Sequence, residues 1–180
     1  DGATYFIGDT VTLRAPDEQN DDFVARIGDV GMRKNKVEVM VQWYYRPEDA
    51  IGGRKGFHGE RELFLSDHKD WVAPDSINDK CQVHTLKQYQ SLHVVSDADY
   101  FCRFSYNIKK AEYRPARVPV YCVCEMPYNP DRFMVECEAC TDWIHPECLR
   151  MTKAEVEVMT HFVCPDCTKR HQSEGKRGTP

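Results

Sequence analysis

Eight potential metal ligands in the last third of the chain most constrain how it can fold. They follow the spacing C-x-C-x12-C-x2-C-x4-H-x2-C-x15-C-x2-C. A segment this short buries too little apolar surface to fold alone. Eight thiolate and imidazole ligands make two closed tetrahedral sites for structural zinc, so we expect two Zn²⁺ ions and no open position for catalytic water. The eight are Cys122, Cys124, Cys137, Cys140, His145, Cys148, Cys164 and Cys167.

A disulfide framework is the alternative explanation for closely spaced cysteines, because small secreted domains use it. Here a histidine interrupts the cysteine series at a ligand-like position, and short C-x2-C pairs recur as they do in metal sites. Cys81 and Cys102 lie outside the series and are expected to be buried thiols. We therefore expect zinc, with the cysteines reduced inside a cell.

The order of the ligands resembles that of a PHD finger. Four cysteines, one histidine and three cysteines follow one another, with Trp143 two residues before His145 and Phe162 two residues before Cys164. The resemblance implies a cross-brace, in which Cys122, Cys124, His145 and Cys148 share one zinc and Cys137, Cys140, Cys164 and Cys167 share the other. The RING finger, a ubiquitin-ligase module with the same brace, normally has histidine as its fourth ligand, whereas here histidine is the fifth.

Composition and charge limit the classes of partner. With 41% hydrophobic and 29% charged residues, the chain is ordinary for a soluble globular protein. Its apolar runs fall short of the ~20 residues that a membrane helix needs. Residues 119–168 hold nine acidic and three basic side chains. Nucleic-acid binders usually present a basic face, so direct DNA binding is not expected. An acidic module suits a basic partner, although a merely solvated surface would show the same counts.

The first two thirds of the chain have the pattern of short strands separated by turns. Val37–Tyr45 (VEVMVQWYY) is the clearest, because β-branched and aromatic residues recur with a period of two. Helical periodicity is weak, so we predict a mainly β domain, either barrel-like or a sandwich. The six expected strands are Tyr5–Ala15, Phe23–Val30, Val37–Tyr45, Arg61–Ser66, Lys80–Leu86 and Tyr100–Tyr106.

Three motifs in this β region resemble a BAH domain. They are QWYYRPED at Gln42–Asp49, FHGERELFLSDH at Phe57–His68 and INDKCQVHTL at Ile77–Leu86. A BAH domain followed at once by a PHD finger resembles the small plant-type BAH–PHD chromatin readers. The resemblance implies a BAH-type β-barrel-like domain over 1–116, a cross-brace PHD finger over 117–168, and a basic disordered tail over 169–180, in a nuclear protein that is a monomer.

Aromatic residues in the finger are candidates for binding a methylated lysine, because ring faces attract a cation that donates few hydrogen bonds. In PHD fingers that bind histone H3 trimethylated at lysine 4, cage residues occupy the positions of Tyr121, Tyr128, Met134 and Trp143. The strand Arg132–Glu136 would pair with the peptide backbone, with Met134 facing the peptide. The alternative is that these rings merely pack the small core.

Acidic residues beside the finger's cage are candidates for a second contact. Glu138 and Asp142 would take the peptide arginine two residues before the methyl-lysine, because carboxylates match a guanidinium. As ordinary surface acids they would need no such role. The resemblance also implies that backbone carbonyls near Met159–Phe162 receive a free N-terminal amine.

The BAH region offers a second possible cage. Trp43 and Tyr45 point to one side of a strand by the two-residue period. Family members that bind H3 trimethylated at lysine 27 build a cage from such a W-x-Y pair and an aromatic of the preceding strand, which here is Phe23 where the plant readers usually have tyrosine. Trp71 would form a further wall, with His68 or Asp49 near the peptide. The alternative is a structural strand in a protein-docking module.

The sequence favours a binding protein over an enzyme. IGGRKGF at residues 51–57 lacks the ending of a phosphate-binding loop, and the cysteines suited to nucleophilic attack are used by zinc. We expect a reader of histone H3 in transcriptional repression or switching, with lysine 4 bound by the finger and lysine 27 by the BAH domain. The alternatives are a RING-like ubiquitin ligase or adaptor, and a nucleosome scaffold that uses Arg54–Lys55 and the basic tail.

Overall fold

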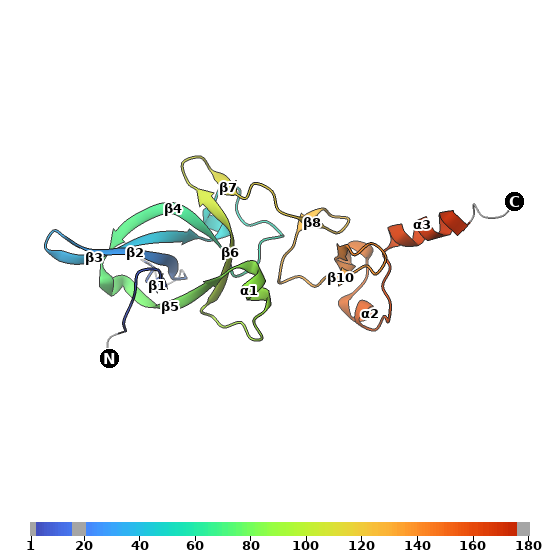
Figure 1. Cartoon of the computed structure of the whole chain (residues 1–180), viewed down its shortest axis with the longest axis horizontal. Coiled ribbons are helices and arrows are strands. Elements are labelled where there is room, and N and C mark those ends of the chain that lie inside the picture. Colours follow the sequence, from blue (N-terminus) through green and yellow to red (C-terminus); the bar gives the residue numbers. More distant parts are fainter. Residues whose placement is uncertain (1–2, 16–20, 176–180) are drawn as a thin grey trace. The chain divides into compact units, whose positions relative to one another are not determined.

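The chain forms two compact units, Asp1–Arg117 and Val118–Pro180, and each is described by itself (Figure 1). The structure is a computed structural model that describes residues 3–15 and 21–175, with side chains as far as residue 170. Within these residues, every helix is too short or too polar to cross a membrane. The fold is mainly β, which confirms the expected class.

The first unit contains seven strands, two 3₁₀ turns and one short helix. Each of the six expected strands has a counterpart, and a seventh, β7, was not predicted. In chain order the elements are β1 (Thr10–Leu13), β2 (Phe23–Arg33), β3 (Lys36–Tyr45), η1 (Pro47–Asp49), β4 (Glu62–Val72), η2 (Pro74–Ser76), β5 (Ile77–His84), α1 (Leu86–Gln90), β6 (Asp99–Asn107) and β7 (Glu112–Arg114).

The strands close into a barrel. Their order is β4-β3-β2-β1-β5-β6-β7, and a further pairing of β4 with β6 closes β1 to β6 into a ring, with β7 attached to β6. Most pairings are antiparallel, but β6 runs parallel to both β4 and β5. Figure 1 shows the long, curved β2, β3 and β4 side by side along the barrel. Closure covers the edge of β4, which could otherwise pair with another chain.

Alternating side chains fill the barrel. Val39 and Val41 of β3 are buried, as the two-residue period requires, and they meet Val11 and Leu13 of β1. A second cluster of Val24, Leu63, Cys81 and Tyr100 lies nearby, and Tyr44 packs against it. Trp43, two residues from Val41, packs against the first cluster, so Trp43 and Tyr44 lie on opposite faces of β3 and each contacts one of the two clusters.

A two-residue turn joins β2 and β3. The expected strands ended at Val30 and began again at Val37, but pairing continues to Arg33 and Lys36 and leaves only Lys34 and Asn35 between the paired residues. Their φ angles are 49° and 60°. Two consecutive positive φ values are typical of a type I′ turn, whose twist matches that of the flanking strands, so the strands can pair up to it.

A wide bulge interrupts β4 where it crosses β3. Gln42 is opposite Lys69, but Tyr44 is opposite Leu65, so residues 66–68 of β4 face Trp43 alone. The Ser66 hydroxyl donates to the Trp43 carbonyl over 2.8 Å and accepts from the His68 backbone N–H over 3.1 Å. These bonds satisfy polar groups that the ladder leaves unpaired, and thus fix the bulge.

A buried ion pair supports the barrel at β4 and β6. The guanidinium of Arg103 donates to both carboxylate oxygens of Glu62, from Nε over 2.6 Å and from Nη2 over 3.0 Å. The side chain of Glu62 is fully buried and that of Arg103 is 10% exposed. Glu62 also accepts from the Gly59 N–H, so the pair holds the preceding loop. Bidentate geometry makes such a pair tolerable away from water.

The second unit has little regular structure and a small core of cysteines and apolar residues. Its elements are β8 (Val120–Tyr121), β9 (Met126–Pro127), β10 (Val135–Glu136), β11 (Trp143–Ile144), η3 (Pro146–Leu149), α2 (Lys153–Glu157) and α3 (Pro165–Gly175). Strand β10 pairs with β11, and β8 pairs with β9.

The basic tail differs from the expectation of disorder from residue 169. Helix α3 continues to Gly175, while residues 176–180 lie outside the described part of the chain. Pro165 stands at the first helical position, where its fixed φ favours a helix. The Thr168 N–H then donates to the Cys164 carbonyl over 3.0 Å, which closes the first turn.

Candidate functional site

Two clusters of four ligands lie in the second unit. In each, one sulfur or ring-nitrogen atom per residue lies within 4.8 Å of the others. These are the two sets that the PHD resemblance implied. The first is Cys122, Cys124, His145 and Cys148, and the second is Cys137, Cys140, Cys164 and Cys167.

The donor chemistry of the clusters fits a soft divalent cation. Burial and the neighbouring Cys122 sulfur raise the pKa of Cys148 to about 12, and burial and Cys164 do the same for Cys167. Burial opposes ionisation of Cys137 as well, but the N–H groups of Cys164 and of its own loop outweigh it and lower its pKa to about 6. Thiolates crowded in this way need a cation between them, which a tetrahedral metal supplies.

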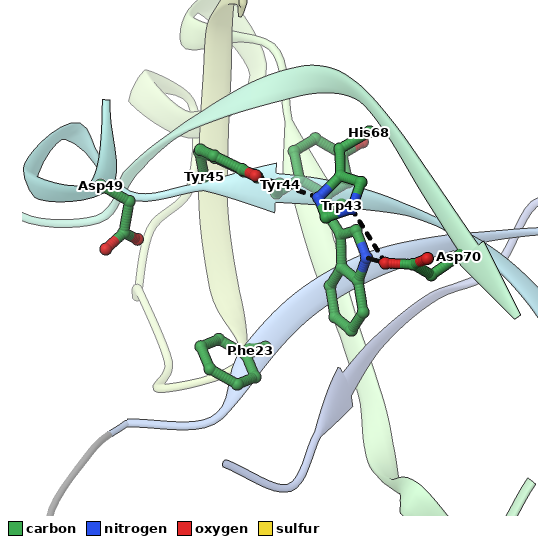
Figure 2. A pocket seen from close by; sticks show the side chains of 7 residues that line it. All are labelled: Phe23, Trp43, Tyr44, Tyr45, Asp49, His68 and Asp70. Atoms are coloured by element: carbon green, nitrogen blue, oxygen red, sulfur yellow. Dashed lines mark hydrogen bonds and ion pairs between the residues drawn. The ribbon is translucent and has the colours of Figure 1, made fainter. Parts of the chain in front are cut away.

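An open pocket lies on the outside of the barrel where β2, β3 and β4 meet. It has a volume of about 350 Å³. Figure 2 shows the rings of Phe23, Trp43 and Tyr45 around it. Phe23 meets Trp43 edge to face, with 6.0 Å between the ring centroids. The fold thus brings together the three rings that were proposed from the sequence as walls of one cage. The lining residues are Phe23, Trp43, Tyr44, Tyr45, Asp49, His68 and Asp70.

A chain of polar contacts joins the two β3 rings through β4. The Tyr45 hydroxyl lies 3.0 Å from His68 Nδ1, and His68 Nε2 lies 2.9 Å from Asp70 Oδ2. The indole N–H of Trp43 donates to the same Asp70 oxygen over 3.2 Å (Figure 2). Burial, and then the nearby Asp49 carboxylate, raise the pKa of Tyr45, so its hydroxyl stays protonated at neutral pH.

The pocket is negatively charged at its rim. Asp49 and Asp70 both line it, and Asp49 also lines an adjoining cavity of about 450 Å³. That cavity includes Asp21 and Glu48 together with Arg46. Aromatic walls beneath a carboxylate rim suit an organic cation, because the ring faces and the carboxylates attract it together.

Trp71 does not form a wall of this pocket, contrary to expectation. It pairs with Met40 on the ladder, stacks with Arg33 at 5.2 Å and approaches Gly31. Side chains alternate along β4, so Trp71 lies on the face opposite Asp70. His68 and Asp49, expected near the peptide, do line the pocket. Asp70 was missed, although its position two residues after His68 was a usable signal.

The candidate cage of the finger is less enclosed. Trp143 is 41% exposed on β11, while Tyr121 and Tyr128 are partly buried against the finger's core. Met134 is only 6% exposed and belongs to that core. Met134 therefore does not face a peptide, contrary to expectation. Met134 lies just before β10, and its side chain points inward because the small core of the finger needs it as packing.

The two candidate acids of the finger have partners within it. The Glu138 carboxylate lies 3.0 Å from His161 Nδ1 and remains half exposed. Asp142 accepts from the Trp143 backbone N–H over 2.8 Å, which caps the short β11. The carbonyl of Phe162, one of those expected to receive an N-terminal amine, accepts from the Glu138 N–H over 3.0 Å.

Comparison with known proteins places both units. A BAH domain model matches residues 3–117, which is more than half of the chain, and a PHD-finger model matches residues 122–167. "Chromatin remodeling protein EBS" of Arabidopsis thaliana is 49% identical over 162 residues, covering 89% of this chain and 69% of that protein. The chain belongs to the BAH–PHD family. "Chromatin remodeling protein SHL" of the same plant is 44% identical, with 92% and 74% covered.

The finger has relatives of its own. "Histone lysine demethylase PHF8" of Danio rerio is 41% identical over 56 residues, which cover 31% of this chain and 5% of that protein. BAH domains and PHD fingers are binding modules, so this BAH–PHD chain is a chromatin-binding protein and not an enzyme.

Proposed function

We propose that this BAH–PHD protein reads two methylated lysines of histone H3, with the barrel pocket binding trimethylated lysine 27 and the finger binding trimethylated lysine 4. The observation that carries the proposal is the pocket of Phe23, Trp43 and Tyr45 with carboxylates at its rim. A trimethylammonium is bulky, cationic and without N–H donors, so ring faces bind it better than a polar site does. Each cation–π contact contributes ~0.5–2 kcal/mol.

The charge around the pocket supports a basic peptide as ligand. Asp49 and Asp70 line the pocket, and Asp49 also belongs to the adjoining cavity, where Asp21 and Glu48 pair with Arg46 and Arg54. Histone tails are rich in lysine and arginine, so such a surface speeds association and favours the correct register of the peptide. Because charge alone does not detect methylation, the rings must supply that discrimination.

The geometry of the finger supports the second half of the proposal. Trp143 is exposed and lies between two metal ligands in sequence, Cys140 and His145, so metal binding would hold its backbone rigidly. Among the described residues, β10 pairs with β11 alone, so its other side is open to a peptide strand. The proposal includes a zinc ion in each four-ligand cluster, where it would supply structural support and no catalysis.

The cellular role follows from the same proposal. Two relatives that cover most of this chain are named as chromatin remodeling proteins, which supports a nuclear protein acting on chromatin. The proposal gives the protein two marks to bind, one on lysine 4 and one on lysine 27. A protein that binds both is suited to transcriptional repression or to switching between states.

Peptide titration of the zinc-loaded full chain tests this function. Trp43→Ala should weaken binding of the lysine 27 trimethylated peptide by about tenfold or more and spare the lysine 4 peptide, since an aromatic wall is lost. Trp143→Ala should do the reverse. Trp71→Ala is the matched control, because Trp71 is in the barrel but outside the pocket. Equal affinity of wild type for methylated and unmethylated peptides would overturn the proposal.

A further inference from the structure

We propose that His68 and Asp70 are positioning residues, which together fix the two cage rings of β3 and set the charge that the bound cation meets. This inference rests on the proposed function of the barrel pocket. It concerns two residues that contribute no aromatic wall to the cage. Their effect is exerted through Trp43 and Tyr45, and through the net charge beside them.

The contacts form an unbroken path between the rings. The Tyr45 hydroxyl meets His68 Nδ1, His68 Nε2 meets Asp70, and Asp70 accepts from the Trp43 indole. In the neutral tautomer with the proton on Nε2, His68 donates to Asp70 and accepts from Tyr45, so every group is satisfied. Each ring is thereby bound at its polar edge, and its face is left to the pocket (Figure 2).

The bulge of β4 explains why these two residues reach the rings. Three residues of β4 oppose Trp43 alone, and Ser66 ties the bulge to the Trp43 carbonyl. His68 and Asp70 then leave the bulge on the same side of the strand. Strand β4 therefore holds Trp43 twice. Ser66 bonds to its backbone carbonyl, and Asp70 bonds to its indole.

The pair also sets the charge beside the cage, because the Asp70 carboxylate lines the pocket together with Asp49. The Tyr106 ring of β6 lies beside Tyr45, with 6.1 Å between the ring centroids. Asp67, on the bulge, is occupied by the Asn107 amide and the Ile108 N–H.

A cationic ligand therefore meets the charge of Asp70 at short range. Asp70 Oδ2 accepts from the Trp43 indole over 3.2 Å, so a cation against the indole lies within Coulombic reach of the carboxylate. The His68 ring lies beside the same indole, with 6.3 Å between the ring centroids.

Binding of the lysine 27 trimethylated peptide by the full chain is the first test. Asp70→Asn should bind about fivefold or more weakly, because the amide keeps an acceptor for Trp43 but carries no charge, and the difference should shrink at high salt. His68→Ala breaks the link between Tyr45 and Asp70 and should also weaken binding, and His68→Gln should recover part of that loss.

Removal of one hydroxyl tests the positioning half. Tyr45→Phe keeps the ring face but loses the bond to His68, and should weaken binding by about fivefold. Tyr113→Phe removes the same atom from a tyrosine that donates to the Ile51 carbonyl and is absent from the pocket lining, so it should leave affinity unchanged. Unchanged affinity in Tyr45→Phe together with unchanged affinity in Asp70→Asn would overturn the proposal.

A measurement without ligand separates this proposal from the proposed function. In Trp71→Phe/Trp143→Phe, Trp43 is the one remaining tryptophan of the chain. Its fluorescence anisotropy should fall when Asp70→Asn or His68→Ala is added, because an indole that is held less firmly moves more freely. If wild type shows no preference for the methylated peptide, the proposed function fails while this measurement still decides the positioning role. An anisotropy that neither substitution changes would overturn that role.

Discussion

At the residue scale, the sequence identified side chains whose position follows from the two-residue period of a strand. Trp43 and Tyr45 share a face because they are two apart, and Phe23 lies beside them because β2 pairs with β3. The side-chain directions of Trp71 and Met134 were predicted wrongly. Which face a residue occupies depends on strand pairing, and strand pairing cannot be read from the sequence. Asp70 gains its importance from the bulge of β4, and bulges leave a weak signal in sequence.

His58 gives a prediction about acid stability. Burial, and then the charges of Arg103 and Arg54, lower its pKa from 6.5 to about 4, so the folded barrel holds it neutral. The unfolded chain takes up a proton at higher pH, so stability present above pH 6.5 is lost as pH falls toward 4. The loss should reach up to about 3 kcal/mol. Urea unfolding across this range, followed by tryptophan fluorescence in Trp143→Phe, measures it.

The matched control is His58→Asn. His58 Nδ1 accepts from the Lys55 N–H, and the asparagine oxygen can take its place without titrating. The variant should show a shallower decline in stability between these pH values. Parallel curves for the two proteins would contradict the assignment of the decline to His58.

The buried pair of Glu62 and Arg103 gives a second prediction. Arg103→Met leaves a fully buried carboxylate without its partner and should reduce the free energy of unfolding by about 3–5 kcal/mol. Adding Glu62→Leu removes the stranded charge and should restore part of that loss. Urea denaturation of both single variants and the double variant checks this, and strictly additive losses would argue against the coupling.

At the element scale, the sequence predicted the strands more reliably than their ends. Each expected strand exists, but β2 and β4 are longer than predicted because hairpin partners extend the ladder beyond the apolar stretch. Helix α1 was missed since it has only five residues, although Thr85 and Gln88 form a capping box at its start. Thr152 and Glu155 do the same for α2, so both helices had a local signal.

The β2–β3 turn gives an element-scale prediction. Lys34 and Asn35 both have positive φ, which a residue with a Cβ adopts at a cost and glycine adopts freely. Asn35→Gly should therefore raise the stability of the barrel by about 0.5–1 kcal/mol, whereas Asn35→Ala should lower it. Thermal unfolding followed by tryptophan fluorescence checks the pair, and a stabilising alanine would contradict the assigned turn.

At the scale of the whole molecule, two units were predicted from the sequence because they are stabilised differently, one by an apolar core and the other by metal ligands. The barrel buries apolar clusters between closed strands, whereas the finger has a small core built largely from metal ligands. The finger's partition into two clusters was implied by its resemblance to PHD fingers, and the fold brings the same two sets of ligands together. The end of the last helix is indicated less clearly by the sequence. Helix α3 extends beyond the expected domain boundary at residue 168.

Metal removal should therefore affect the two units differently. A chelator should unfold the finger, whose clustered thiolates would repel one another, and abolish its peptide binding. The barrel should keep its fold and its affinity for the lysine 27 peptide. Peptide titration of the chelated full chain, with zinc added back as the control, measures both. Loss of both activities on chelation would contradict independent stabilisation.

The bulge at residues 66–68 makes this pocket vulnerable to a change in length rather than in chemistry. Shortening that stretch by a single residue would leave two residues against Trp43 and would shift the alternation of the strand beyond it by one position. Lys69 would then stand where Asp70 now lines the pocket, and a site built for cations would repel them. Lineages that alter this length would be expected to keep a folded barrel and to lose the capacity to recognise a methylated tail.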